Sequence, residues 1–185
     1  MTIAELLFFE DILTPEYAER LKTIGKPSML CGRVVPDSLD GLTYGQLIDL
    51  QKASNARELI VVSARAILGE DLQEQKIMAE DGEAFYGFIL WLKSEVERIN
   101  DLFKSVEYQP TPEEVQAGYY KMNLNLGEFP TLDWYARRMG IADHDEVLKV
   151  GWVRIFACKK IDHENQLFQK RVQDLRDAKA RQKKR

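Results

Sequence analysis

The chain has 185 residues, of which 45% are hydrophobic, and it carries a formal net charge of −4. That length and apolar share are enough to bury a core. No run of about eighteen apolar residues occurs, and acidic residues interrupt the first segment where a signal peptide requires an apolar centre. We therefore expect a soluble globular protein made and kept in a cytoplasm. Cys31 and Cys158 lie in apolar neighbourhoods far apart, a pattern of buried thiols and not of a disulfide scaffold.

Capping residues and proline divide the first part of the chain into helices and one loop. Thr14 followed by Pro15 is typical of a helix start, and Thr43 with Gln46 has the pattern of a capping box. Glycine, proline and serine fill much of the stretch between these starts, which predicts a loop with one short strand. The expected elements are helices at 15–24, 43–52 and 55–69, with a loop-rich segment at 25–42.

The clearest periodic pattern lies at residues 83–106. Apolar residues recur there at steps of four and three, which keeps them on one face of a helix for about six turns. The first half of this helix is apolar all round, so we expect neighbours to enclose it, and its second half offers charges to water. With the preceding helices, it is expected to form an N-terminal helical core over residues 1–106.

A proline-containing linker separates this helix from the rest of the chain. Proline ends the helix, and Thr111 with Pro112 begins another, which we expect to end near Asn123. A further short helix is expected from Thr131, and Gly140 ends it.

The only two histidines stand among carboxylates, His144 in Asp-His-Asp-Glu and His163 in Asp-His-Glu. Such clusters raise the question of a metal or acid/base site, but Asp143 and Glu146 also form a helix-capping pair. Apolar positions keep helical spacing after this cap, so we expect one continuous helix from residue 143. On that helix the histidines lie about 28 Å apart at 1.5 Å per residue. A shared metal site is then excluded unless the helix breaks at Gly151.

Taken together, these elements predict a mainly α fold, a bundle of six or seven helices with a loop-rich N-terminal segment and a long C-terminal helix. Two domains are expected. Residues 1–106 form the helical core, and residues 111–185 form a helical hairpin with a projecting basic helix.

No other pattern indicates catalysis. Cys158 and His163 are five residues apart, which turns them by about 140° around a helix and prevents a local nucleophile and base pair. The serines lie in no Gly-x-Ser-x-Gly setting, and no glycine-rich phosphate loop occurs. We expect a protein that is not an enzyme and that needs no cofactor and no metal.

The last helix carries a narrow apolar stripe that indicates binding. A stripe this thin is typical of a helix docked on one side only, as in a coiled coil, and the single Asn165 within it would fix register. The partner is another copy or another protein; alternatively, the helix folds back on its own domain. Trp152 and Phe156 also fit an ordinary core. The candidate partner-binding residues are Trp134, Tyr135, Trp152, Phe156, Phe168, Val172 and Leu175.

The end of the chain is basic. Residues 170–185 contain eight basic and two acidic residues, a balance of +6 in a chain of net charge −4, so residues 1–169 carry −10. Such an end can bind an anion, a membrane surface or nucleic acid, or it is a solvated helix end that complements the helix dipole. No aromatic residue is interleaved to stack on bases. The candidate anion-binding residues are Lys179, Arg181, Lys183, Lys184 and Arg185.

Four segments of the second half resemble small helical proteins encoded among the assembly genes of tailed bacteriophages, and the nearest class is the tail assembly chaperones. The segments are Pro112–Gly118, Leu126–Asp133, Asp145–Trp152 and Glu164–Arg171. The resemblance implies a role in binding a phage structural or tape-measure protein, expression in the host cytoplasm, and no cofactor. It leaves open whether the protein is a transient chaperone or a structural or packaged protein retained in the virion.

Overall fold

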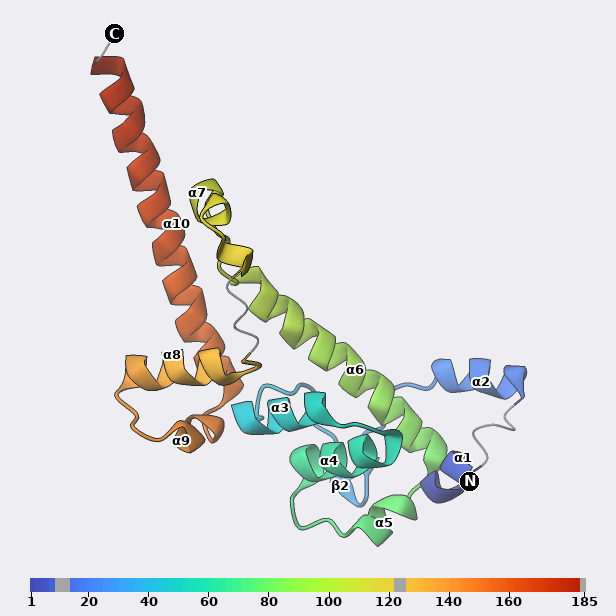
Figure 1. Ribbon diagram of the computed structural model, residues 1–185. Helices are drawn as coiled ribbons and strands as arrows, with labels where there is room; N and C mark the ends of the chain where they lie inside the picture. The colour runs from blue at the N-terminus through green and yellow to red at the C-terminus, as the bar shows by residue number, and fades with distance from the viewer. Residues whose placement is uncertain (9–13, 122–125, 184–185) are drawn as a thin grey trace.

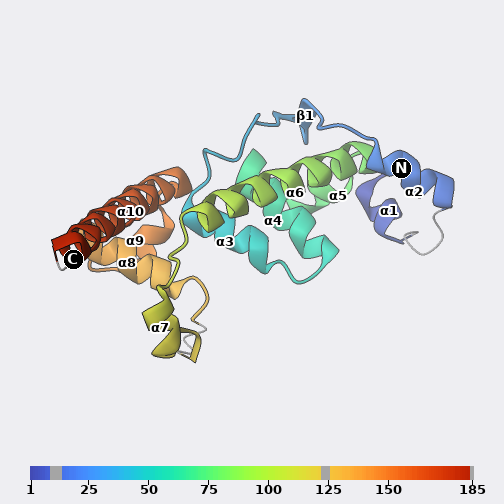
Figure 2. The same ribbon diagram turned by 90° about the horizontal axis from the view of Figure 1, so that it is seen from above.

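The computed structural model describes residues 1–8, 14–121 and 126–183. The chain is 69% helix and 5% strand, which confirms the mainly α prediction and the long C-terminal helix. Two long helices, α6 (Gly82–Ser105) and α10 (Trp152–Lys183), dominate the shape (Figure 1). The other elements lie along α6 and beside the first part of α10, while the rest of α10 extends away from them (Figures 1 and 2).

Ten α-helices lie within the described ranges, where the sequence predicted six or seven. The shorter elements are α1 (Ile3–Phe8), α2 (Pro15–Lys22), β1 (Met29–Leu30), β2 (Arg33–Val34), α3 (Tyr44–Lys52), α4 (Ala56–Leu68), α5 (Glu74–Met78), α7 (Pro112–Gln116), the 3₁₀ helix η2 (Tyr119–Lys121), α8 (Phe129–Met139) and α9 (His144–Leu148).

The capping residues begin the helices as the sequence predicted. The Thr43 hydroxyl accepts a hydrogen bond from the Gln46 amide, and the Gln46 side chain accepts one from the Thr43 amide. Thr111 makes the same reciprocal cap at the start of α7. That helix ends at Gln116 and not near Asn123, which lies outside the described residues, and α8 begins two residues before the expected Thr131.

The loop-rich segment contains a small antiparallel hairpin, where one strand was expected. Met29 pairs with Val34 and Leu30 with Arg33, so a two-residue turn joins β1 and β2. Cys31 and Gly32 make that turn with φ values of 52° and 74°, the left-handed conformation that such a tight turn requires. Cys31 is buried and, like Cys158, is a free thiol.

Two connected sets of apolar side chains form the core. One gathers α1, α4, α5 and the first half of α6 around Phe85 and Phe88. The other joins α3 and the second half of α6 to α8, α9 and the start of α10, with Trp152 and Ile155 among its members. This second set crosses residue 106, so the division of the chain expected there does not coincide with a division of the core.

The expectation of one helix from residue 143 is wrong, because the helix breaks at Gly151. α9 ends at Leu148, and Gly151 forms an isolated β-bridge with Thr43. The Tyr44 amide donates to the Val150 carbonyl at 2.8 Å, and the Trp152 amide donates to the Leu42 carbonyl at 3.2 Å. The segment before α3 therefore holds these backbone groups outside a helix, and the rod begins at Trp152.

Candidate functional site

The helix α10 is buried at its start and exposed along the rest of its length. Trp152 and Ile155 are 2% and 0% exposed, whereas Ile161, Phe168 and Leu175 are 53%, 54% and 63% exposed. The last three residues follow each other at intervals of seven, which places them on one side of the helix. Asn165 and the half-buried Val172 lie between them on the same side. We call these five residues the outward stripe.

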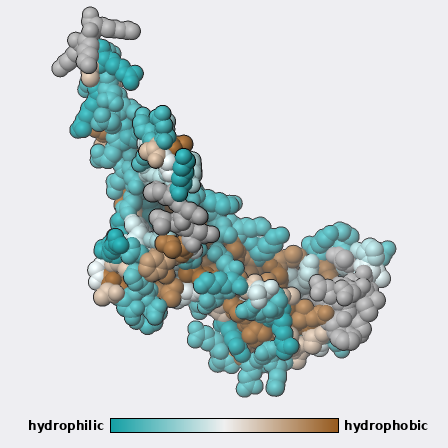
Figure 3. All heavy atoms as spheres, viewed as in Figure 1, coloured by the Kyte–Doolittle hydropathy of each residue, from teal (hydrophilic) through white to brown (hydrophobic). Residues whose placement is uncertain are grey.

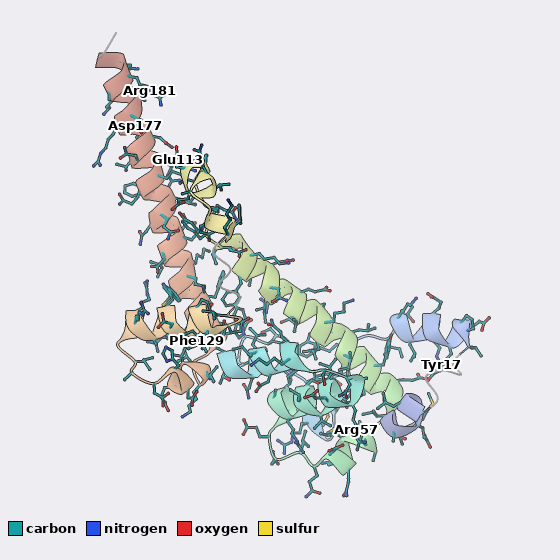
Figure 4. All side chains as sticks on the ribbon, in the orientation of Figure 1. Tyr17, Arg57, Glu113, Phe129, Asp177 and Arg181 are labelled. Carbon is teal, nitrogen blue, oxygen red and sulfur yellow. The ribbon has the colours of Figure 1, made fainter. Side chains whose placement is uncertain are left out.

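The outward stripe lies on the opposite side of α10 from the residues that pack on the body. Counting 100° per residue, Trp152, Ile155 and Lys159 share one face, and Ile161 and Phe168 lie close to half a turn away from it. Figure 3 shows the projecting part of α10 as largely hydrophilic, with few hydrophobic residues among the charges. Asp177 and Arg181 stand on this part, well away from the body (Figure 4). Beyond Gln166, as far as Gln182, every residue of α10 is exposed except the half-buried Val172.

A cleft of about 640 Å³ lies between α10 and the body. Side chains from α3, α6, α8 and α10 line it, together with residues that follow α6 and Tyr119 of η2. About half of the lining residues are aromatic or aliphatic, and the others are polar or charged. The lining includes Tyr44, Leu47, Phe103, Tyr108, Tyr119, Glu128, Trp134, Lys159 and His163.

Two polar features shape the interior of this cleft. The Tyr44 hydroxyl donates to Glu128 Oε2 at 2.6 Å, and burial, followed by that hydrogen bond, raises the pKa of Tyr44 well above 10. Lys159 Nζ lies 5.0 Å from the centre of the Trp134 ring, a cation–π contact. Burial lowers the pKa of Lys159 below its ordinary 10.5, and the nearby carboxylates, Glu128 first, partly oppose that shift.

The two histidines do not form a common site. His163 lines the cleft, while His144 begins α9, with its ring centre 5.1 Å from that of Phe129 and its Nε2 3.5 Å from Asp133 Oδ1. Asp143 caps α9 as predicted, but its carboxylate accepts from the Asp145 amide, and the Glu146 side chain pairs with Lys149 instead of completing the expected capping pair. Within the described ranges, no three His, Cys, Asp or Glu side chains lie close enough together to share a metal ion.

Two of the predicted partner-binding residues belong to the core. Tyr135 and Trp152 are 1% and 2% exposed, so neither offers a surface to a partner, and for Trp152 the alternative reading as core is correct. Trp134 and Phe156 are half-buried, and the Trp134 ring makes cation–π contacts with both Arg138 and Lys159. Of the predicted aromatic residues, only Phe168 is largely exposed.

The predicted anion-binding residues lie at the far end of α10. Lys179 and Arg181 are exposed, and Lys183 is the last residue of the helix. Lys184 and Arg185 lie outside the described residues. Tyr108, Tyr119 and Trp134 line the cleft near the start of α10 and not this basic end.

The sequence did not predict the cleft. Its lining comes from elements far apart in the chain, which no local pattern brings together. One signal was present: Lys159 falls four residues after Ile155 and seven after Trp152, on the face of α10 that packs on the body. A lysine at such a position is half-buried and must direct its charge into a gap between elements.

No family model matches the chain, and no curated protein or solved structure matches it either. In the part of the chain that the structure describes, no helix combines the length and the apolar character needed to cross a membrane.

Proposed function

We propose that the protein is a non-enzymatic protein-binding factor that holds its partner along the outward stripe of α10. The observation that carries this proposal is the exposure of Ile161, Phe168 and Leu175, at 53%, 54% and 63%, on a helix that leaves the body. Single exposed apolar residues are common, but a row of them at intervals of seven is the pattern of a helix seam.

Covering the exposed residues of the outward stripe would also stabilise a complex. Burying a large aliphatic or aromatic side chain stabilises a complex by about 1.5–3 kcal/mol relative to leaving it in water. More than half of the surface of Phe168 and Leu175 is still exposed to water, so a partner can bury it. Tyr135 and Trp152 are already buried inside the fold, so a partner gains nothing from them. A partner that covers the stripe therefore gains most from Phe168 and Leu175.

The resemblance to tail assembly chaperones supports a role for this binding in the assembly of a tailed phage particle in the host cytoplasm. One of the four segments that carry the resemblance, Glu164–Arg171, contains Asn165 and Phe168 of the stripe. A protein retained in the virion would use the same surface for a permanent contact. The two roles differ in whether the chain is present in purified particles.

The test compares recovery of partners by the wild-type chain and by the double variant Phe168→Glu, Leu175→Glu. An affinity-tagged full-length chain is recovered from host cells in which particles are assembling, and bound proteins are identified by mass spectrometry. We expect a tape-measure or other structural protein with the wild type and at least tenfold less of it with the double variant, because two buried charges are strongly unfavourable. Lys170→Glu, Gln173→Glu, on the other side of the same helix, is the matched control.

Equal recovery by wild type and double variant, with both helical by circular dichroism, contradicts the proposal. A stripe-dependent partner that is no particle component would overturn the assembly role while leaving the binding role in place. Binding of nucleic acid that falls steeply with salt, and that is lost when residues 178–185 are deleted, would favour the basic end as the functional surface instead.

A further inference from the structure

We infer that in the free protein the outward stripe is covered by a second copy of this chain, with the two α10 helices antiparallel. The inference rests on the proposed function, since it names the occupant of the same surface. It comes from the charges beside the stripe, which decide the orientation of paired helices.

Charged side chains flank the stripe on both edges. Glu164 and Arg171, seven residues apart, follow one edge, and Arg176 lies on the other. All three are exposed, and among the residues that the structure describes none of them forms an ion pair. Asp162, on the same edge as Arg176, is already paired with Arg138 of α8.

A parallel pair of α10 helices brings like charges together. In a parallel coiled coil, a residue on one edge meets the residue five positions later on the opposite edge of the partner. Arg171 of each copy would therefore face Arg176 of the other, so the repulsion would occur twice. The basic residues at 170–185 would also lie side by side in the two copies.

An antiparallel pair brings opposite charges together. When Ile161 lies opposite the partner's Val172, Asn165 lies opposite the partner's Phe168 and the apolar positions alternate along the seam. In this register Glu164 faces the partner's Arg171, and the symmetry of the pair repeats the contact. The seam from Ile161 to Val172 is about 17 Å long at 1.5 Å per residue.

The same orientation sets the basic end of each copy against the acidic part of the other. Residues 170–185 carry +6 and residues 1–169 carry −10. In the antiparallel register, the last turn of α10 comes level with the first turn of the partner's α10, where the partner's body begins. The two bodies then lie at opposite ends of the seam.

The test measures the mass of the purified full-length chain by sedimentation equilibrium over a dilution series. The wild type is expected to show a concentration-dependent dimer. Arg171→Glu should weaken that dimer by about tenfold, because it replaces two attractive pairs by repulsive ones. The double variant Glu164→Arg, Arg171→Glu should restore it. The matched control is Lys170→Glu, the same charge change on the neighbouring exposed residue, away from the edge of the stripe.

A wild-type chain that stays monomeric at every concentration overturns the second copy as partner. The proposed function then still stands if a partner is recovered by the wild type and lost with Phe168→Glu, Leu175→Glu, and it fails as well if that recovery does not change. If Arg171→Glu strengthens the dimer, the antiparallel orientation is wrong. In a parallel pair this substitution would remove the repulsion between Arg171 and the partner's Arg176, and the dimer would tighten.

Discussion

The indole N–H of Trp152 donates a hydrogen bond to the backbone carbonyl of Leu39 at 2.8 Å, across 113 positions of the chain. Trp152 is the first residue of α10, and Leu39 lies in the loop before α3. The bond fixes the start of the projecting helix to the body. It acts together with the backbone bonds between Leu42, Tyr44 and residues 150–152 that hold the same point of the chain.

Trp152→Phe should lower the free energy of unfolding by about 2–3 kcal/mol, because it removes this hydrogen bond and part of a buried side chain. Chemical denaturation followed by circular dichroism measures the change. Recovery of the partner by the folded variant should be unaffected, since Trp152 is core. An unchanged stability, or loss of the partner from a fully folded variant, contradicts this assignment.

Glu95 connects the same loop to α6. Its carboxylate accepts hydrogen bonds from the Leu39 amide at 3.0 Å and from Arg98 at 2.8 and 2.9 Å. The hydrogen bonds from Arg98 are the main reason that the pKa of Glu95 lies below its ordinary 4.5. A lowered folded-state pKa means that the carboxylate stabilises the fold above pH 4.5, and that this contribution is lost as pH falls through the lower value.

Glu95→Gln should therefore cost about 1–2 kcal/mol at neutral pH, with a smaller difference from the wild type below about pH 4. Thermal denaturation of both proteins across this pH range measures the effect. Glu97→Gln, an exposed position on the same helix, is the control. A difference that is constant with pH would show that the charge of Glu95 has no part in it.

Tyr44 should make the stability of the fold depend on pH in the opposite direction, at alkaline pH. Burial raises its folded-state pKa above 10, so the protonated hydroxyl stabilises the fold below pH 10, and this contribution is lost as pH rises towards the folded value. Tyr44→Phe should cost about 1–2 kcal/mol at pH 8, because Glu128 loses its hydrogen bond. The wild type should then lose stability faster than the variant above pH 10. Parallel melting curves would contradict the prediction.

Substitution of Asn165 tests whether the one polar residue of the outward stripe limits self-association. Asn165→Leu should tighten self-association and broaden it to higher-order species, because a polar residue in a helix seam sets partner number at a cost in affinity. Sedimentation measures both effects. Gln166→Leu, which points into the cleft, is the matched control and should leave the mass unchanged. A mass distribution that Asn165→Leu does not alter would remove Asn165 from the seam.

Much of the helical architecture could be predicted from the sequence, because its signals are local. Threonine caps began α2, α3 and α7, and steps of four and three identified α6 almost to its ends. The helices α1 and α5 were missed. Each is short, and each owes its stability to a buried residue, Ile3 or Ile77, that packs on other elements.

The break at Gly151 could not be predicted from the apolar pattern, because Val147 and Ile155 keep helical spacing across it. The pairing of Gly151 with Thr43 decides the backbone there, and that contact spans more than a hundred residues. The cleft escaped prediction for the same reason. The outward stripe could be predicted, because a helix that leaves the body keeps the pattern that its own sequence gives it.

The central claim is that the outward stripe is the contact surface of this protein. Hydrogen–deuterium exchange of the full-length chain, free at high dilution and in its assembled state, tests it most directly. We predict that assembly slows exchange over residues 161–176 and leaves α6 unchanged. Unchanged exchange over 161–176, with protection confined to the cleft or to residues beyond 178, would contradict the account.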